Sequence, residues 1–283
     1  MKRKQLTSKL RKSNIKGKDV VAGVGEIGKP ILQLLSKSNI TIGYDVNPKL
    51  FDKKNFEKLK NIDTCFLHIC IPFTTKFISQ VKSLYRKFSP KCIVIHSTIS
   101  PYTTKKLQSD LLIPIIYSPT RGVHNRMISD IKKYTKFYAL EKNAPNNKWA
   151  SENYSSLLKK CGIKSKIMSK PITLELAKIV VDTSYYGWLI NYAQLSNMIA
   201  KEHNVDYDEM WSFTDEIHKF LGNRPKMFPG FIGGHCVIPN LDLIHNQTLD
   251  LIKKINDSYL KKIPKAKSIN KKYDKSKKQS YDV

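Results

Sequence analysis

Short apolar runs alternate with longer mixed stretches over the first 170 residues of the chain. The apolar runs have the length of strands and lie at 19–22, 65–71, 91–97, 113–119, 136–140 and 163–168. The stretches between them have the length of helices and include 74–88, 100–110 and 147–160, the last ending before Gly162. Strands that alternate with helices are typical of a parallel, doubly wound sheet.

The pattern changes after Pro171. Residues 172–204 contain no helix breaker apart from Gly187 and are apolar on nearly every face. Such a helix needs a second domain or a partner subunit to cover it. Further helices are expected at about 206–221 and from near Asn240. The sequence therefore predicts a Rossmann-type α/β domain followed by a smaller all-α domain built on a long central helix.

The expected domain boundaries follow from these patterns and from the basic ends of the chain. We predict a basic extension at 1–18, an α/β domain at 19–170, a helical domain at 171–255 and a lysine-rich, disordered tail at 256–283.

Composition narrows the class of protein. The 283 residues are 41% hydrophobic, which supports a core, yet no apolar run is long enough to cross a membrane. The N-terminal segment lacks the apolar centre of a signal peptide. The five cysteines form no CxxC pair and no disulfide framework, which favours a reducing, cytoplasmic setting. A soluble protein outside the membrane is expected.

The net charge of +27 raises the possibility of nucleic-acid binding. Much of that charge lies at the two ends of the chain, where lysines predominate. Only six of the 50 basic residues are arginine, the residue that base recognition and bidentate phosphate contacts favour. The charge pattern therefore favours solvated basic ends over specific nucleic-acid recognition.

The segment "GVGEIG" at 23–28 has the spacing of a dinucleotide-binding turn. It follows a predicted strand and opens a predicted helix, whose N-terminal N–H groups would face a pyrophosphate. Asp45 ends the next strand, where a carboxylate binds both ribose hydroxyls and disfavours a 2′-phosphate. These features predict an NAD site; the alternative is a glycine turn without a ligand.

Several motifs occur in the order found in the nucleotide-sugar 6-dehydrogenases, the family of UDP-glucose, UDP-N-acetylmannosamine and GDP-mannose dehydrogenases. From about residue 18 to 245 the chain resembles this family. The matching segments are "GVGEIGKP" (23–30), "HICIPF" (68–73), "HSTISPYTT" (96–104), "ELAKIVVD" (175–182) and "GFIGGHCVIPN" (230–240). The last segment, a glycine-rich loop that ends in His235 and Cys236, is the most specific of them.

The resemblance implies a site and a chemistry. The implied catalytic residues are Cys236, Lys178, Asp182 and Asn240. The implied cofactor contacts are Gly23, Gly25, Ile27, Gly28, Asp45, Pro72, Ser97 and Thr98. The implied substrate contacts are Arg121, Gly233, Gly234 and His235. Cys236 would capture an aldehyde as its thiolate, Lys178 would stabilise an oxyanion, and the product would serve as a polysaccharide precursor. No metal is expected, since adjacent His and Cys lack further ligands.

Each of these roles has a structural alternative. Cys236 could be a small buried apolar residue, Lys178 a surface lysine, His235 a residue that packs the loop, and Arg121 an ordinary loop charge.

The chain departs from the family pattern at specific positions. Asp182 and Asn240 stand where the family has asparagine and aspartate. Either acid and amide have exchanged places, or Asn240 only caps the last helix and Asp182 pairs with a lysine. Thr120 replaces a glutamate and cannot act as a base. The family's C-terminal nucleotide-binding domain is expected to be absent.

The leading hypothesis is an NAD-dependent oxidoreductase that oxidises a sugar primary alcohol, in two steps through a Cys236 thioester, as a homodimer. One alternative is a single-step dehydrogenase of the β-hydroxyacid type acting on another small hydroxy substrate. The other is an NAD-binding protein without turnover.

Overall fold

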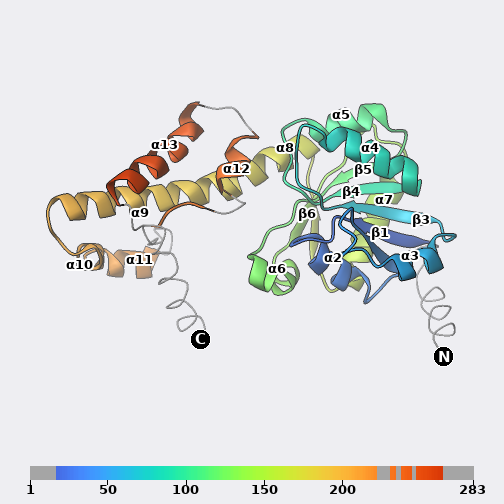
Figure 1. The fold of residues 1–283 in the computed structure, drawn as a ribbon, viewed down its shortest axis with the longest axis horizontal. Coiled ribbons are helices and arrows are strands. Elements are labelled where there is room, and N and C mark those ends of the chain that lie inside the picture. Colours follow the sequence, from blue (N-terminus) through green and yellow to red (C-terminus); the bar gives the residue numbers. More distant parts are fainter. Residues whose placement is uncertain (1–16, 222–229, 234–236, 244–246, 264–283) are drawn as a thin grey trace. The chain divides into compact units, whose positions relative to one another are not determined.

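A computed structural model describes residues 17–221, 230–233, 237–243 and 247–263. The chain divides after Lys178 into two compact units, an α/β unit and a helical unit (Figure 1). Each unit has its own hydrophobic core.

Five parallel strands form the sheet of the α/β unit. They are β1 (Lys18–Ala22), β2 (Thr41–Tyr44), β3 (Thr64–Ile69), β4 (Cys92–Ile95) and β5 (Ile115–Tyr117), in the order β2-β1-β3-β4-β5. The order reverses direction between β1 and β3. In open parallel sheets, such a reversal marks the place where ligands bind, at the carboxyl ends of the strands.

Helices cover both faces of this sheet, because alternate residues of each strand point to opposite faces. Val21 of β1 packs with α2 (Gly28–Leu35), α6 (Met127–Lys133) and α7 (Asn147–Lys160). Val20 and Ala22 face the opposite core, which includes residues of α4 (Phe77–Phe88), α5 (Thr103–Asp110) and α8 (Pro171–Leu176). Helix α3 (Lys53–Leu59) adds Phe56 and Leu59 to the second core. The predicted doubly wound α/β fold is therefore confirmed.

A small second sheet lies beyond β5. Its strands β6 (Lys136–Tyr138) and β7 (Ser165–Ile167) are parallel, and an antiparallel bridge joins Tyr117 of β5 to Ala139. The short 3-10 helix η1 (His124–Arg126) precedes α6.

The helical unit is built on one long helix. A π-helical segment, η2 (Ala177–Ser184), continues α8 and leads into α9 (Tyr185–Glu202). The other helices are α10 (Tyr207–Ser212), α11 (Asp215–Leu221), α12 (Val237–Leu241) and α13 (Gln247–Lys262). Ile190, Ile232, Val237, Leu241 and Ile252 form the core of this unit.

Three sequence predictions about this region are wrong in detail. The stretch 206–221 forms two helices rather than one. The last helix begins at Gln247, while Asn240 lies inside the short helix α12. Helix α13 continues to Lys262 and buries Tyr259 completely, so the first residues of the predicted tail, 256–262, are helical. An aromatic residue on the buried face of a lysine-rich helix explains the difference. Residues 264–283 of that predicted tail lie outside the described residues.

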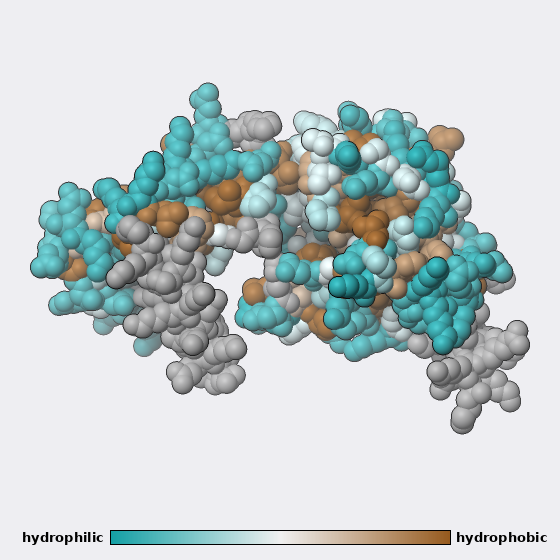
Figure 2. Space-filling model, viewed as in Figure 1, coloured by the Kyte–Doolittle hydropathy of each residue, from teal (hydrophilic) through white to brown (hydrophobic). Residues whose placement is uncertain are grey.

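Several large apolar side chains of α9 are exposed to solvent, although the sequence led us to expect them to be covered. Tyr185, Tyr192, Leu195 and Ile199 are 55%, 63%, 44% and 46% exposed. Figure 2 shows apolar surface along the helical unit. No helix in the described parts of the chain is both long and apolar enough to cross a membrane.

Candidate functional site

The turn between β1 and α2 has the geometry that its glycines predict. Gly23 has φ +88°, and a Cβ atom there would lie 2.8 Å from the carbonyl oxygen of Cys70. A Cβ atom at Gly28 would lie 1.7 Å from the carbonyl oxygen of Gly23, so α2 starts in direct contact with the turn. At Gly25 an added Cβ would meet no atom within 4 Å. Two glycines are thus required by packing, and the third borders open space.

Asp45 lies directly after β2 and is bonded to this turn. Its Oδ2 accepts a hydrogen bond from the backbone N–H of Val24 at 2.7 Å, and its Oδ1 accepts one from the N–H of Asn47 at 2.8 Å. Both donors are main-chain groups, which fixes the half-buried carboxylate at the edge of the glycine turn. In dinucleotide-binding folds, a carboxylate at the end of the second strand accepts a hydrogen bond from the ribose.

The carboxyl ends of β1, β3 and β4 lie next to one another. The N–H of Cys70 donates to Ala22 O at 2.8 Å, and the Ser97 hydroxyl donates to Ile71 O at 2.6 Å. The segment that contains exposed Pro72 and the segment that contains Ser97 and half-buried Thr98 are therefore joined. Ile27 is half-buried and packs against the core of the sheet. The structure thus brings these cofactor-contact candidates to one edge of the sheet.

Lys136 organises the turn that follows β5, and the sequence analysis did not single it out. Its buried Nζ donates to Ser118 O at 2.9 Å, to Pro119 O at 3.0 Å and to Thr120 Oγ1 at 3.1 Å. The pKa of Lys136 is lowered to about 7, chiefly by burial; Cys70 opposes this shift, and the charges of Lys178 and Arg121 contribute to it. The feature of the sequence that could have indicated this role is a lysine at the first position of an otherwise apolar strand, β6.

Arg121 is fixed by main-chain and ring contacts. Its Nη2 donates to Thr135 O at 2.6 Å, and its guanidinium carbon lies 5.1 Å from the centre of the Phe137 ring. Thr135 directly precedes strand β6, and Phe137 lies within it. The predicted substrate contact is thus a half-buried residue with a defined orientation.

Two histidines pair inside the α/β unit. His68 Nδ1 and His96 Nε2 are 3.0 Å apart, and their rings stack with an interplanar angle of 22°. Burial, aided by the charge of Lys136, lowers the pKa of His68 to about 3, and burial also holds the pKa of His96 well below its usual range. Both imidazoles are therefore neutral near pH 7.

Lys178 and Asp182 lie on the π-helical segment η2, one half-buried and the other exposed. π-helical insertions are frequent at functional sites. Asn240 does not cap the last helix, as one alternative held, because it lies within α12. Its Nδ2 donates instead to the hydroxyl of Thr183 at 3.3 Å. Thr183 directly follows Asp182 in the sequence.

The loop with the most specific motif is described in part. Gly233 is exposed, whereas Gly234, His235 and Cys236 lie outside the described residues. The buried amides of Gln194 and Asn256 bind the start of this loop. These two residues were absent from the sequence-based site, because nothing in a helical pattern distinguishes a buried amide from an exposed one.

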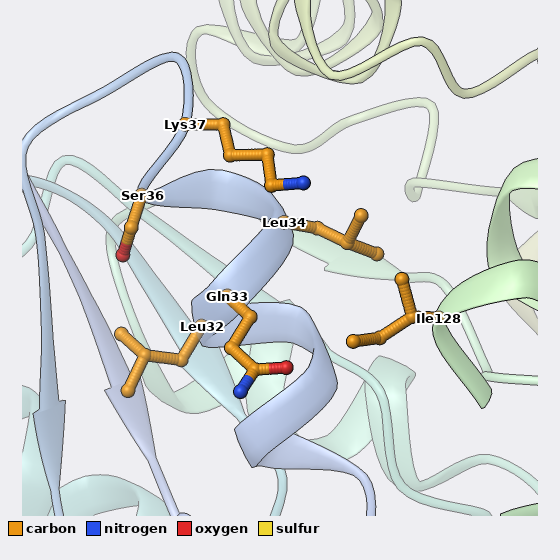
Figure 3. Close-up of a pocket in the computed structure, with 6 residues that line it drawn as sticks. All are labelled: Leu32, Gln33, Leu34, Ser36, Lys37 and Ile128. Atoms are coloured by element: carbon orange, nitrogen blue, oxygen red, sulfur yellow. The ribbon is translucent and has the colours of Figure 1, made fainter. Parts of the chain in front are cut away.

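Two other features bear on the site. A hollow of about 450 Å³ lies at the end of α2 away from the glycine turn, between Leu32, Gln33 and Ile128 (Figure 3). Its position separates it from the cofactor candidates. In the described parts of the chain, no group of three or more His, Cys, Asp or Glu residues is placed to hold a metal ion.

No protein-family model matches the chain, and its sequence matches no curated protein. Solved structures do share its fold. The UDP-D-ManNAc dehydrogenase of Pyrococcus horikoshii matches with a TM-score of 0.67 and 17% identity, over 86% of this chain and 68% of that one. The UDP-N-acetyl-mannosamine dehydrogenase Cap5O of Staphylococcus aureus matches with a TM-score of 0.64 and 18% identity, over the same shares.

A third neighbour belongs to another group of enzymes. The 3-hydroxyisobutyrate dehydrogenase of Mycobacterium tuberculosis matches with a TM-score of 0.62 and 12% identity, over 87% of this chain and 94% of that one. At these identities the matches establish the fold: a Rossmann-type sheet followed by a helical region, as in these dehydrogenases.

Proposed function

We propose that the chain is an NAD-dependent oxidoreductase that acts on a CH–OH group. The observation that carries this proposal is the Asp45 carboxylate, bonded to the Val24 N–H of the turn and next to the open space at Gly25. Such a turn lets a pyrophosphate approach the backbone, while the carboxylate accepts hydrogen bonds from the ribose. When bound, NAD would accept the hydride.

The preference for NAD over NADP follows from charge. The 2′-phosphate of NADP would lie beside the Asp45 carboxylate, and the two negative groups would repel each other. Asp45→Ala should therefore weaken NAD binding and raise the relative affinity for NADP. Titration of the purified protein with both cofactors measures this. Tighter binding of NADP than of NAD by the unchanged protein would contradict the assignment.

The proposed substrate is a sugar nucleotide with a primary alcohol. Its oxidation would use NAD bound at the turn 23–28 and the thiol of Cys236. Lys178 stabilises the alkoxide as the alcohol loses its proton and its hydride. The thiolate of Cys236 would then add to the aldehyde carbon, loss of a second hydride would convert the adduct to a thioester, and water would cleave the thioester to a carboxylate and release the thiolate. Bound NAD would serve as the acceptor of each hydride. Gly233, Gly234, His235 and Arg121 would contact the substrate.

The base for thioester hydrolysis is proposed to be Asp182. Thr120 cannot take this role, because its hydroxyl is not basic near neutral pH and instead binds Lys136. Asn240 bonds to Thr183 and so lies close to the segment that contains Asp182. Asp182→Asn should permit formation of the thioester and slow its hydrolysis, which mass spectrometry of the acylated protein would detect.

A second candidate is a single oxidation of a small hydroxy acid. The chain spans nearly the full length of the 3-hydroxyisobutyrate dehydrogenase, against about two thirds of the sugar-nucleotide enzymes. This reaction also uses a lysine on the central helix, in the position of Lys178, and needs no cysteine.

One experiment separates these candidates. NADH formation is followed with UDP-sugars, GDP-sugars and small hydroxy acids, for the unchanged protein, Cys236→Ser and Lys178→Ala. The sugar-nucleotide proposal expects two NADH per substrate and a carboxylate product, with one NADH left in Cys236→Ser. Lys178→Ala should lose about 100-fold or more in rate with any substrate. Turnover of a hydroxy acid that is unaffected in Cys236→Ser supports the second candidate, and NAD binding without turnover contradicts both.

A further inference from the structure

Two buried amide side chains hold the described start of the glycine loop, residues Gly230–Gly233. Gln194 of α9 donates from Nε2 to Gly230 O at 2.7 Å. Asn256 of α13 accepts from Ile232 N–H at 2.8 Å with Oδ1 and donates from Nδ2 to Ile232 O at 3.2 Å. The two amides are also bonded to each other, Nε2 of Gln194 to Oδ1 of Asn256, at 3.0 Å.

These contacts take the place of secondary structure. Gly230 and Ile232 are buried, and main-chain polar groups that are buried need hydrogen-bond partners. Neither residue is part of a helix or a strand. The side chains of Gln194 and Asn256, 0% and 3% exposed, supply the partners for three main-chain groups within three residues. Removal of one amide would leave a buried N–H or C=O without its bond, which is more costly than loss of the bond alone.

A third amide fixes the orientation of this pair. Asn191 donates from Nδ2 to Gln194 Oε1 at 2.8 Å, which directs the Nε2 of Gln194 toward Gly230. Amide side chains can rotate to exchange their N and O atoms, so a donor on Oε1 removes that freedom. Asn191 is itself buried.

We propose that Gln194 and Asn256 are positioning residues for the cysteine loop. They fix the main chain of residues 230–233 in the helical unit and thereby the point from which the chain continues to Gly234, His235 and Cys236. The inference rests on the proposed function for its consequence at Cys236. The anchoring of the loop by the two helices does not depend on that function.

The same two helices provide a matched control. Tyr259 of α13 donates from its hydroxyl to Asn197 Oδ1 of α9 at 3.3 Å, and both residues are buried. Within the described residues, Asn197 makes no hydrogen bond to the segment 230–233. Asn197→Ala therefore removes a buried amide from the α9–α13 packing and leaves the loop contacts intact.

Hydrogen exchange tests the anchoring directly. In the holoprotein with NAD, amide exchange of the peptide covering 230–233 is compared for the unchanged protein, Asn256→Ala, Gln194→Met and Asn197→Ala. The proposal expects exchange about 10-fold faster or more in the first two variants and unchanged exchange in Asn197→Ala. Equal exchange in all four proteins would overturn it. Gln194→Met keeps the volume of the side chain, and this variant decides if Asn256→Ala fails to fold.

A second measurement tests the consequence for Cys236. The rate of alkylation of Cys236 by iodoacetamide and the kcat and KM of the proposed oxidation are compared in the same variants. Asn256→Ala and Gln194→Met should change the alkylation rate several-fold and lower kcat, while the Kd for NAD stays unchanged. Asn197→Ala should change none of these. If Asn197→Ala alters them as much as Asn256→Ala, the amides act through stability alone and the proposal is wrong.

The two inferences fail separately. Altered exchange and alkylation in a protein that oxidises no sugar nucleotide would retain the positioning role and contradict the proposed function. Oxidation of a sugar nucleotide, with unaltered alkylation in Asn256→Ala and Gln194→Met, would support the proposed function and contradict the positioning role.

Discussion

The three glycines of the turn after β1 have different physical roles despite their common motif. Gly28 lies against the carbonyl of Gly23, and Gly23 lies against the carbonyl of Cys70, so both positions exclude a side chain. Gly25 has space around it. A motif found in a sequence does not separate glycines needed for the fold from those needed for a ligand, whereas the geometry does.

We expect the two classes of glycine to differ in their response to a methyl group. Gly28→Ala places a Cβ 1.7 Å from Gly23 O, so the protein should lose several kcal/mol of stability or fail to accumulate folded. Gly25→Ala should keep its melting temperature within a few degrees and lose NAD affinity by about 10-fold or more, since a Cβ there would occupy space next to the phosphates. Thermal unfolding and NAD titration measure the two effects. A Gly25→Ala protein that unfolds as easily as Gly28→Ala would contradict this division.

The buried histidine pair predicts a loss of stability in acid. Between pH 6.5 and the folded-state pKa of about 3, His68 binds a proton in the unfolded state and none in the folded state. The unfolding free energy therefore falls as the pH falls through this window, by about 2 kcal/mol for His68 at pH 5. His68→Gln cannot titrate but can still bond to His96. The advantage in stability of the unchanged protein over this variant should shrink by about that amount between pH 7.5 and pH 5, in urea unfolding. If the difference in unfolding free energy between the two proteins stays constant with pH, the pKa of His68 is not lowered by folding.

At the scale of elements, helix α8 completes the N-terminus of α5. Tyr102, the residue before α5, has φ +66° and offers no side-chain cap. Glu175 of α8 takes that role, accepting bonds from Tyr102 N–H at 2.6 Å, Thr104 N–H at 3.0 Å and the Thr104 hydroxyl at 2.6 Å. A carboxylate from another helix thus satisfies the orphan donors of a helix start.

Glu175→Ala should destabilise the α/β unit by about 2 kcal/mol or more, because it leaves the buried N–H and hydroxyl of Thr104 without their acceptor. Glu175→Gln provides the control, since its amide oxygen keeps one acceptor and its volume is the same. We expect the order unchanged protein, Gln, Ala in unfolding free energy from urea titration. An Ala variant as stable as the Gln variant would show that water replaces the carboxylate.

The elements of the α/β unit could be predicted from the sequence, and the contacts of the candidate site only in part. Periodicity placed β3, β4, α7 and the glycine turn, because alternation and breaker residues are local signals. The stretch at 206–221 was read as one helix, although it divides into α10 and α11 with no Gly or Pro between them. Lys136, Gln194 and Asn256 could not be found, because their roles depend on burial and on partners far away in sequence.

At the scale of the whole molecule, the exposed face of α9 is the main feature that the isolated chain leaves without a physical account. Tyr185, Tyr192 and Ile199 recur every seven residues and are about half exposed or more, with Leu195 between them. Apolar side chains at heptad spacing on one helix face are typical of helix association.

We propose that the chain forms a homodimer through this face. Leu195→Asp with Ile199→Asp should shift the protein to a monomer at micromolar concentration in sedimentation velocity, because burial of two carboxylates is costly. Phe213→Asp is the control, since Phe213 is 89% exposed and lies outside α9. A stable monomer of the unchanged protein, or a dimer that survives the double substitution, would contradict the proposal.

The open space at Gly25 has an evolutionary consequence. A single methyl group there is expected to impair the proposed cofactor site while the fold tolerates it, whereas the same change at Gly28 is expected to destabilise the fold or prevent its accumulation. A lineage released from selection for catalysis could therefore drift to an inactive but well-folded descendant in one step. Within a set of related chains, the residue at position 25 would then distinguish catalytically active proteins from inactive ones, and the residue at position 28 would be glycine in both.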